Sequence, residues 1–598
     1  MKSFFKYVLA TIVGFVIINI LVFILFFGFI GALATMGDKT VEIKDNSILE
    51  ITLANSIPDR TSTNPFDNLD FMSMKSTPSL GLNNILKSIR HAASDPKIKG
   101  IYLNITDIQS YFLPFATAEE IRNALVDFKK SGKFIYSYTN LGYSQTGYYL
   151  ATAADSVLVN PETPLMLMGL GSNVIFYKDL LEKIGVKAEI IKVGKYKSAV
   201  EPFTRTEVSE ANREQISAYM HSLWGTMLKS ISESRHISVD SLNWLADNLN
   251  YRTPLEEMAF GLYDGVCYED QMLLFLKGKC QIAADKKLPL VSLADYNKSI
   301  TGKTLSAGKN KIAVIYASGQ IGMSQSPKTI GPELAATVRK VRQDKNVKAV
   351  VLRVNSPGGS ALTSDIIWRE VELTTREKPV IVSMGNVAAS GGYYISCAAD
   401  TIVADPMTLT GSIGIYGQFF TGEKLIKDKL GLTSSSIKTN AHSDFGGAYP
   451  LPLPIGNRPL NAYEKQVLQK YIENGYETFL NRVAQGRHIT RDEVHEVAQG
   501  RVWTGEQALR VGLVDVLGGL NDAISIAAGK AGLEKFSLSE YPVEKNPFEE
   551  LFSGLSASLK ARILNAELGG YYDTFCDLKE MMNTQQGLVA RLPYDIKF

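Results

Sequence analysis

Cysteine and histidine are scarce in this chain, which contains four cysteines and six histidines among its 598 residues. The cysteines are far apart and form no C-x-x-C pair, so the sequence carries neither a zinc pattern nor a disulfide scaffold. Cys267 and Cys280 are close enough in sequence to pair, although two buried thiols explain them equally well. We expect no metal and no other cofactor.

An excess of charge of either sign is also absent. The chain has 63 Lys and Arg against 61 Asp and Glu, a formal net charge of +2. That balance alone decides nothing, but we find no basic tract of the kind that binds nucleic acid, and we expect no such partner. Apolar residues make up 45% of the chain, as is usual for globular proteins, and the length allows two to four domains.

Long apolar runs are missing everywhere except near the first residue. Residues 7–36 form an uncharged apolar run that follows Lys2 and Lys6 and exceeds the roughly 20 residues that span a bilayer. A signal peptide has a shorter apolar core, so we expect residues 1–37 to be an uncleaved membrane anchor, although Ala32-Leu33-Ala34 resembles a cleavage site. The two lysines favour a cytoplasmic N-terminus, which places the remaining chain outside the cytoplasm.

The chain repeats itself at a separation of about 250 residues. Residues 94–105 match residues 343–354, and residues 133–161 match residues 378–406 without a gap. Each copy alternates strand patterns with helical ones, so we expect an α/β fold made by tandem duplication of a unit of βα repeats. The predicted ranges are 44–300 for the first half, 310–540 for the second half, 288–309 for the join, and 541–598 for a mostly helical extension.

Ser390 stands where a nucleophile can be activated. A strand is predicted over residues 380–382 and a helix over residues 393–399, and Ser390-Gly391-Gly392 lies between them. Backbone N–H groups at the start of a helix stabilise negative charge, and glycines allow a substrate backbone to approach. The aligned residue of the first half is Gln145. A simple N-cap is the commoner role of such a serine, and it stays open at this point.

A second turn upstream completes this pattern. Residues 349–360 form a strand that ends in Pro357-Gly358-Gly359, where backbone N–H groups can hold an oxyanion. The first half has residues 104–108 at this place, without glycine. A Gly-Gly turn followed about thirty residues later by Ser-Gly-Gly resembles the ClpP/crotonase superfamily. In that superfamily the two segments face one acyl site.

A serine nucleophile needs a base that accepts its proton. Among the histidines, His442 is the candidate that lies in a predicted loop. His236 and His488 occupy matching positions in the two halves, so we expect them to be structural.

Lysine is the alternative base, provided that its pKa is lowered toward neutrality. In residues 190–203 the lysines alternate with apolar residues and would share one face of a strand. A solvated edge strand has the same pattern. The spacing does not choose between Lys195 and Lys197.

Four segments together resemble the protease IV (SppA) family, the long, duplicated type of bacterial signal peptide peptidase. They are YKSAVEPF at 196–203, NSPGGS at 355–360, AASGGYYIS at 388–396 and LTGSIGIYG at 409–417. The resemblance covers nearly the whole chain and implies a dyad of Ser390 and Lys197, with Ser412 hydrogen-bonded to the lysine. It also implies a ClpP/crotonase-like fold for each half, with Gly391 and either Gly358 or Gly359 holding the oxyanion.

The same resemblance implies a function. We expect a serine endopeptidase, anchored in the bacterial inner membrane and assembled as a homotetramer, whose body lies on the periplasmic side. Its expected substrates are signal peptides released from preproteins and other apolar peptides. The alternatives are a catalytically degenerate membrane scaffold and a serine peptidase that uses His442 as base. A crotonase-type acyl-CoA enzyme would need a cytoplasmic body, which the predicted anchor argues against.

Overall fold

The structure is a computed structural model that describes most of the chain between residues 42 and 543. The described ranges are 42–53, 56–62, 80–105, 113–163, 167–248, 252–301, 310–323, 329–445, 458–543 and 589–591, with a few isolated residues. Most of the predicted anchor (residues 1–37) and of the predicted extension (residues 541–598) therefore lies outside the described residues. Within the described residues, no helix is both long and apolar enough to span a membrane.

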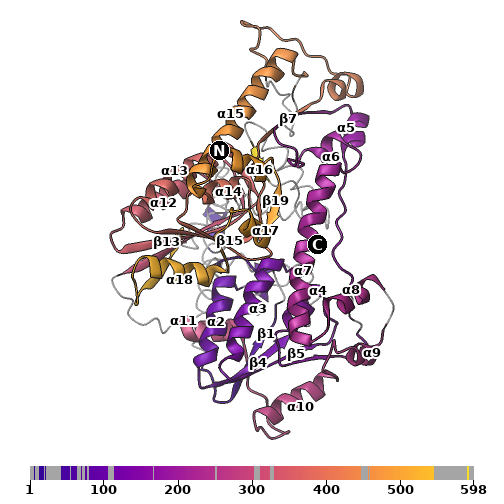
Figure 1. Cartoon of the computed structure of the whole chain (residues 1–598), viewed down its shortest axis with the longest axis vertical. Coiled ribbons are helices and arrows are strands. Elements are labelled where there is room, and N and C mark those ends of the chain that lie inside the picture. Colours follow the sequence, from indigo (N-terminus) through magenta and orange to yellow (C-terminus); the bar gives the residue numbers. More distant parts are fainter. Residues whose placement is uncertain are drawn as a thin grey trace.

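The first half is built on a parallel sheet with the strand order β8-β6-β5-β4-β1-β9 (Figure 1). The strands are β1 (Ser47–Ile51), β4 (Ile98–Asn104), β5 (Phe134–Thr139), β6 (Ser156–Val159), β8 (Gly265–Val266) and β9 (Leu290–Ser292). Helices α2 (Leu82–Ser94) and α3 (Phe115–Lys129) cover one face, and α10 (Glu269–Lys279) covers the other. Because both faces are buried, the strands are apolar along most of their length.

The structure decides two points that the sequence left open in the first half, the extent of the join and the state of two cysteines. Strand β9 pairs with β1, so part of the join predicted over residues 288–309 belongs to the sheet of the first half. Extended backbone at the open edge of β1 gains a hydrogen-bonded partner in this way. Cys267 and Cys280 are free thiols.

The second half repeats this design. Its sheet has the order β19-β17-β15-β13-β10-β21, and β16 and β20 branch from β15. The strands are β10 (Lys311–Ser318), β13 (Val347–Ser356), β15 (Val380–Ala389), β16 (Thr401–Ala404), β17 (Leu409–Gly411), β19 (Val502–Thr504), β20 (Val516–Leu517) and β21 (Ser537–Tyr541). Helices α12 (Glu333–Gln343), α13 (Ala361–Thr375) and α15 (Ala462–Arg487) pack on one face, and α18 (Leu520–Lys530) packs on the other. The predicted α/β class is confirmed.

A third sheet joins the halves, with the order β12-β11-β14-β22-β18-β7. Its strands are β7 (Lys187–Lys192), β11 (Gln320–Ile321), β12 (Thr329–Ile330), β14 (Gly358–Ser360), β18 (Tyr416–Thr421) and β22 (Val589–Arg591). Strand β7 comes from the first half and pairs antiparallel with β18 of the second half. Figure 1 accordingly shows β7 beside α15 and away from the parallel sheet of its own half, together with the neighbouring helices α5 (Lys178–Ile184) and α6 (Glu201–Thr204). This exchange carries the segment after β7 into the second half.

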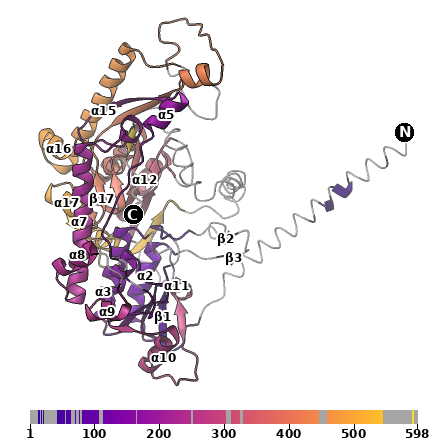
Figure 2. The ribbon, with the colours of Figure 1, turned by 90° about the vertical axis from the view of Figure 1, so that its right-hand side faces the viewer.

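The long helix α7 (Glu210–Arg235) contacts both halves (Figure 2). It packs against α4 (Gln145–Ala151) of the first half and β19 of the second half. His236 ends α7 and His488 ends α15, and both residues have left-handed backbone with φ of 57° and 56°. A residue of this conformation terminates a helix, so the predicted structural role of the two histidines is confirmed.

Two predicted boundaries near Ser390 were wrong. The strand predicted over residues 380–382 is β15, which runs as far as Ala389 because β13 pairs with it on one side and β16 and β17 on the other. The helix predicted over residues 393–399 is α14 (Gly391–Ser396) and starts directly after Ser390. Strand and helix therefore meet at Ser390, whereas the predicted bounds left residues 383–392 between them.

The shared sheet predicts that the two halves unfold together. Leu103 and Leu352 are aligned residues of β4 and β13 and are 0% and 1% exposed. Replacing either by Ala should lower the free energy of unfolding by about 2–5 kcal/mol through loss of apolar contact and formation of a cavity. In calorimetry both variants should shift one common transition. Leu362→Ala, at a residue that is 60% exposed, should change stability by no more than about 0.5 kcal/mol. A second transition that Leu103→Ala leaves in place would contradict this coupling.

Candidate active site

Lys197 reaches the second half through a turn that follows β7. The strand ends at Lys192, and Gly194, with φ of 102°, reverses the chain against Gln499. The backbone N–H of Tyr196 donates to the carbonyl of Gln499 at 2.9 Å. The shared strand face that the lysine pattern allowed is therefore not formed, because β7 ends at Lys192 and the turn places Lys195 and Lys197 differently.

The two lysines have opposite environments as a result. Lys195 is exposed and lies over the ring of Tyr196, whereas Lys197 is 0% exposed. Gly500, with φ of 84°, packs directly on the backbone of Lys197. A Cβ atom built on Gly500 would lie 2.6 Å from the backbone nitrogen of Lys197. Burial thus separates two residues that spacing could not separate.

The Lys197 amine contacts two serines of the second half. Its Nζ lies 2.8 Å from Ser390 Oγ, 2.9 Å from Ser412 Oγ and 3.0 Å from the Ser412 carbonyl oxygen. All three partners are uncharged oxygens. The structure therefore brings together the lysine and both serines that the sequence singled out.

Burial lowers the pKa of Lys197 well below its ordinary value of 10.5. The cause is the loss of solvation of the ammonium form, which no buried carboxylate offsets among the atoms that Nζ contacts. A neutral amine has two N–H groups and one lone pair. Two donors directed at the oxygens of Ser412 leave the lone pair for the hydroxyl hydrogen of Ser390. This arrangement suits a general base.

Ser390 has an unusual backbone conformation, with φ of 56° and ψ of −112°. Its N–H donates to the carbonyl of Gly411 at 2.8 Å. Ser412 also has a positive φ, 48°, and its N–H donates to the carbonyl of Arg501 at 2.6 Å. Strain of about 1–3 kcal/mol at such residues persists only where surrounding contacts fix them. The Ser390 side chain does not cap α14, so the simple N-cap alternative was wrong.

Three glycines meet beside Ser390. A Cβ atom built on Gly391 would lie 3.2 Å from Gly358 Cα and 3.2 Å from Gly359 N. Gly359 has φ of 150°, and a Cβ atom there would lie 1.9 Å from the Ile321 carbonyl oxygen. A side chain on Gly391 would push the Gly358-Gly359 turn away from the start of α14, and a side chain on Gly359 would collide with β11, so glycine is required at both positions.

Other candidate residues lie elsewhere. The His442 ring contacts Glu464 at 3.0 Å in a surface cluster with Arg458, and its side chain is 43% exposed. Gln145, the first-half counterpart of Ser390, accepts hydrogen bonds from the backbone of Met168 and Gly169 through its side chain. That position thus holds a loop in the first half and presents a hydroxyl to lysine in the second.

Sequence reasoning missed the contribution of Gly500. A glycine shortly after a helix is typical of a C-terminal cap, and nothing near it in sequence points to Lys197. Its role follows only from the packing of two segments about 300 residues apart.

Comparison with known proteins places the chain in a family. Peptidase family S49 matches residues 127–278 and 372–534. The chain is 34% identical to "Serine protease SPPA, chloroplastic" of Arabidopsis thaliana, over 86% of this chain and 74% of that protein. It is 37% identical to "Protease 4" of Haemophilus influenzae, over 74% and 72%.

A structural comparison gives a weaker similarity. A ClpP1 variant of Listeria monocytogenes superposes with a TM-score of 0.23 at 15% identity, over 35% of this chain and 94% of that one, which is too low to define the fold. The two family matches fall one in each half, and the relatives are covered over more than two thirds of their length. The chain belongs to peptidase family S49.

Proposed function

We propose that this serine peptidase works through a dyad in which Lys197 is the base for Ser390. The observation that carries the proposal is the 2.8 Å contact between Lys197 Nζ and Ser390 Oγ in a fully buried setting. Burial favours the neutral amine, which is the form that accepts a proton. His442, which contacts Glu464 instead, has no comparable support.

The chemistry follows from these positions. Lys197 takes the proton of Ser390, and Oγ attacks the carbonyl carbon of the peptide bond. The N–H of Gly391 and that of Gly358 or Gly359 hold the oxyanion. The ammonium of Lys197 then protonates the leaving amine, and water hydrolyses the acyl-enzyme with Lys197 again as base. Ser412 keeps the amine oriented throughout.

The substrate binds as an extended strand in this proposal. Strand β22 lies antiparallel to Gly358–Ser360 and also pairs with Tyr416 of β18. The space between β14 and β18, beside the glycine turn, therefore accommodates one extended strand. A peptide that replaces β22 would gain the same main-chain hydrogen bonds and present its scissile carbonyl near Ser390.

We further infer the biological setting from the sequence. The substrates are signal peptides left in the membrane and other apolar peptides, since the apolar run over residues 7–36 anchors the enzyme beside them. The body lies on the periplasmic side of the bacterial inner membrane, and the enzyme is a homotetramer. Residues 44–300 and 310–540 are the two ClpP/crotonase-like halves, of which the first supplies lysine and the second supplies serine.

Variants of the dyad test the proposal directly. Ser390→Ala and Lys197→Ala should each lower kcat by about 10³-fold or more, since nucleophile and base act as a unit. Lys197→Arg should be equally inactive, because guanidinium does not release its proton. Lys195→Ala and His442→Ala are the matched controls and should stay within about threefold of wild type. A fluorophosphonate probe should label Ser390 in the wild type. An active Lys197→Ala variant would exclude lysine as the base.

The pH dependence should report the buried amine. Only neutral Lys197 accepts a proton, so kcat/KM should rise with pH and level off above the pKa of Lys197 in the folded enzyme. Because burial lowers this pKa, the midpoint should lie well below 10.5. Steady-state rates of peptide hydrolysis across the pH range measure it. A midpoint at or above 10.5 would contradict the assigned role.

Stability gives an independent readout of the same pKa. A lysine whose pKa falls on folding binds its proton more tightly in the unfolded chain, which lowers stability increasingly as pH falls below 10.5. Lys197→Met keeps the volume and removes this cost. It should therefore be inactive yet melt at a higher temperature than wild type at neutral pH. A lower melting temperature would show that the amine stabilises the fold.

Substrate selection should follow apolarity. A synthetic signal peptide should be cleaved with a kcat/KM at least about tenfold above that of an equally long peptide whose apolar core is replaced by Ser and Gln, since apolar contacts favour the former. Mass spectrometry of the products in detergent measures both rates, and Ser390→Ala supplies the blank. Equal cleavage of the two peptides would contradict the signal-peptide assignment while leaving the dyad intact.

A further inference from the structure

Strand β15 contains an irregularity just before Ser390. It pairs with β13 in regular register up to Val354 and Met384, and the pairing resumes at Ser356 and Ala388. One residue of β13 therefore faces three residues of β15, Gly385–Val387, which we call the bulge. Because the bulge ends three residues before Ser390, its conformation decides where Ser390 is presented.

The bulge contacts the first half through Asn386. Its Oδ1 accepts a hydrogen bond from the backbone N–H of Thr117 at 2.9 Å, and its Nδ2 donates to Thr117 Oγ1 at 2.9 Å. Thr117 lies in the first turn of α3, whose N-cap residue Pro114 has no side-chain acceptor for that turn. The N–H of Thr117, which has no acceptor within the first turn of α3, is thus bonded to the bulge of the other half.

A second contact runs through Asn355. Its Oδ1 accepts a hydrogen bond from the N–H of Val387 at 3.2 Å, and its Nδ2 donates to Asp59 at 2.8 Å. Burial alone would raise the pKa of Asp59, but the charge of Arg353 and the hydrogen bonds that Asp59 accepts hold it below its ordinary value. Asp59, also from the first half, is therefore a buried carboxylate that orients the amide facing the bulge.

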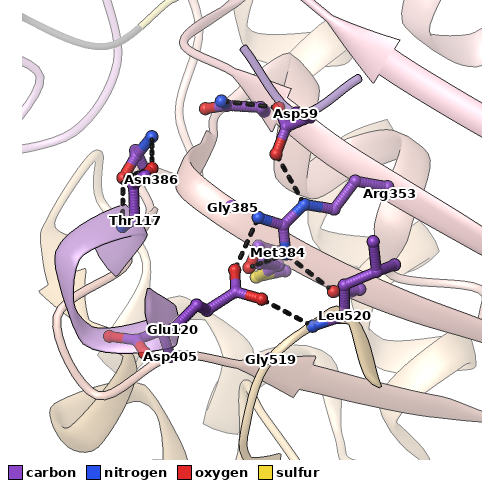
Figure 3. Close-up of polar contacts among 12 residues, drawn as sticks. Asp59, Thr117, Glu120, Arg353, Met384, Gly385, Asn386, Asp405, Gly519 and Leu520 are labelled. Atoms are coloured by element: carbon purple, nitrogen blue, oxygen red, sulfur yellow. Dashed lines mark hydrogen bonds and ion pairs between the residues drawn. The ribbon is translucent and has the colours of Figure 1, made fainter. Parts of the chain in front are cut away.

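Arg353 connects the remaining parts (Figure 3). It is 0% exposed, donates to Asp59 at 2.8 Å and to Glu120 of α3 at 2.6 Å, and its Nη1 reaches Ser383 and the carbonyl of Met384. The second oxygen of Glu120 accepts from the N–H of Leu520 at the start of α18. The aligned residue of the first half is Asn104, so the half that lacks the serine also lacks this arginine.

We propose that Asp59, Thr117 and Glu120 of the first half are positioning residues for the nucleophile of the second half. Thr117 holds the bulge directly, Asp59 holds it through Asn355, and Glu120 acts on the adjoining Met384 through Arg353. Together they hold Ser390 Oγ at the Lys197 amine. Breaking a buried ion pair leaves an unpaired buried charge, which is costly. Arrangements that separate Arg353 from Asp59 or Glu120 are therefore disfavoured. The inference rests on the proposed dyad. Positioning matters for such a pair because a displacement of about 1 Å at a reacting group costs about 10²-fold in rate.

The test uses full-length enzyme and counts competent sites by titration of Ser390 with a fluorophosphonate. Thr117→Val removes the hydroxyl that contacts Asn386, and Asp59→Asn removes the buried charge. Thr117→Ser keeps the hydroxyl. Ser222→Ala is the matched control, because it deletes another hydroxyl bonded between the halves, to Thr504 at 2.8 Å, on strand β19, which does not pair with the bulge itself.

Positioning predicts a specific pattern. In Thr117→Val and Asp59→Asn, kcat per titrated site should fall by about tenfold or more, with KM within about twofold and the acid limb of the pH profile unmoved, since lysine and subsites are unchanged. Thr117→Ser and Ser222→Ala should keep wild-type kcat. Thr117→Val decides the matter if Asp59→Asn does not fold.

A different pattern would overturn the inference. Wild-type kcat per titrated site in Thr117→Val, whatever the yield of folded protein, would mean that the pair only stabilises the fold. An equal loss in Ser222→Ala would mean that any contact between the halves has the same effect. A wild-type enzyme that the probe does not label at Ser390 would overturn the proposed dyad as well, which separates the two failures.

Discussion

The structure depends on excluding water from the Lys197 amine where it contacts the Ser390 hydroxyl. Lys197 Nζ contacts Ser390 Oγ with no exposed surface, and this burial lowers the pKa of the lysine. Desolvation is costly for an ammonium group and useful for a base, so the packing that excludes water is part of the chemistry. Gly500 lies on the Lys197 backbone, and Gly414 lies beside its side chain. Because this lysine and this serine come from different halves, the fold must also hold those halves in a fixed relative position.

Duplication meets this requirement by making the halves unequal. Strand β7 leaves its own sheet to pair with β18, which carries Lys197 into the second half. In return the bulge of β15 receives contacts from α3 of the first half. At the position of Ser390 the first half has Gln145, whose side chain holds a neighbouring loop. In the proposed dyad, the same scaffold thus supplies a base and a support in one copy and a nucleophile with its glycine turn in the other.

Local patterns were enough to predict a large part of this arrangement. Strand and helix periodicity indicated the α/β class, and the glycine turns pointed to the surroundings of Ser390. Spacing could not separate Lys195 from Lys197, since their difference arises from the turn at Gly194 and the packing of Gly500. The bulge and its buried carboxylates escaped prediction because Arg353 and Asp59 are 294 residues apart. The anchor over residues 1–37 stays a prediction.

The central claim is that one chain supplies both members of the dyad. Co-expression of equal amounts of the Lys197→Ala and Ser390→Ala chains, followed by purification and assay of peptide hydrolysis, tests it most directly. A dyad within one chain predicts no activity above that of either variant alone, because every intact serine remains beside its own missing lysine. Recovery approaching about a quarter of wild-type activity, the value for lysine and serine drawn at random from neighbouring chains, would contradict the account.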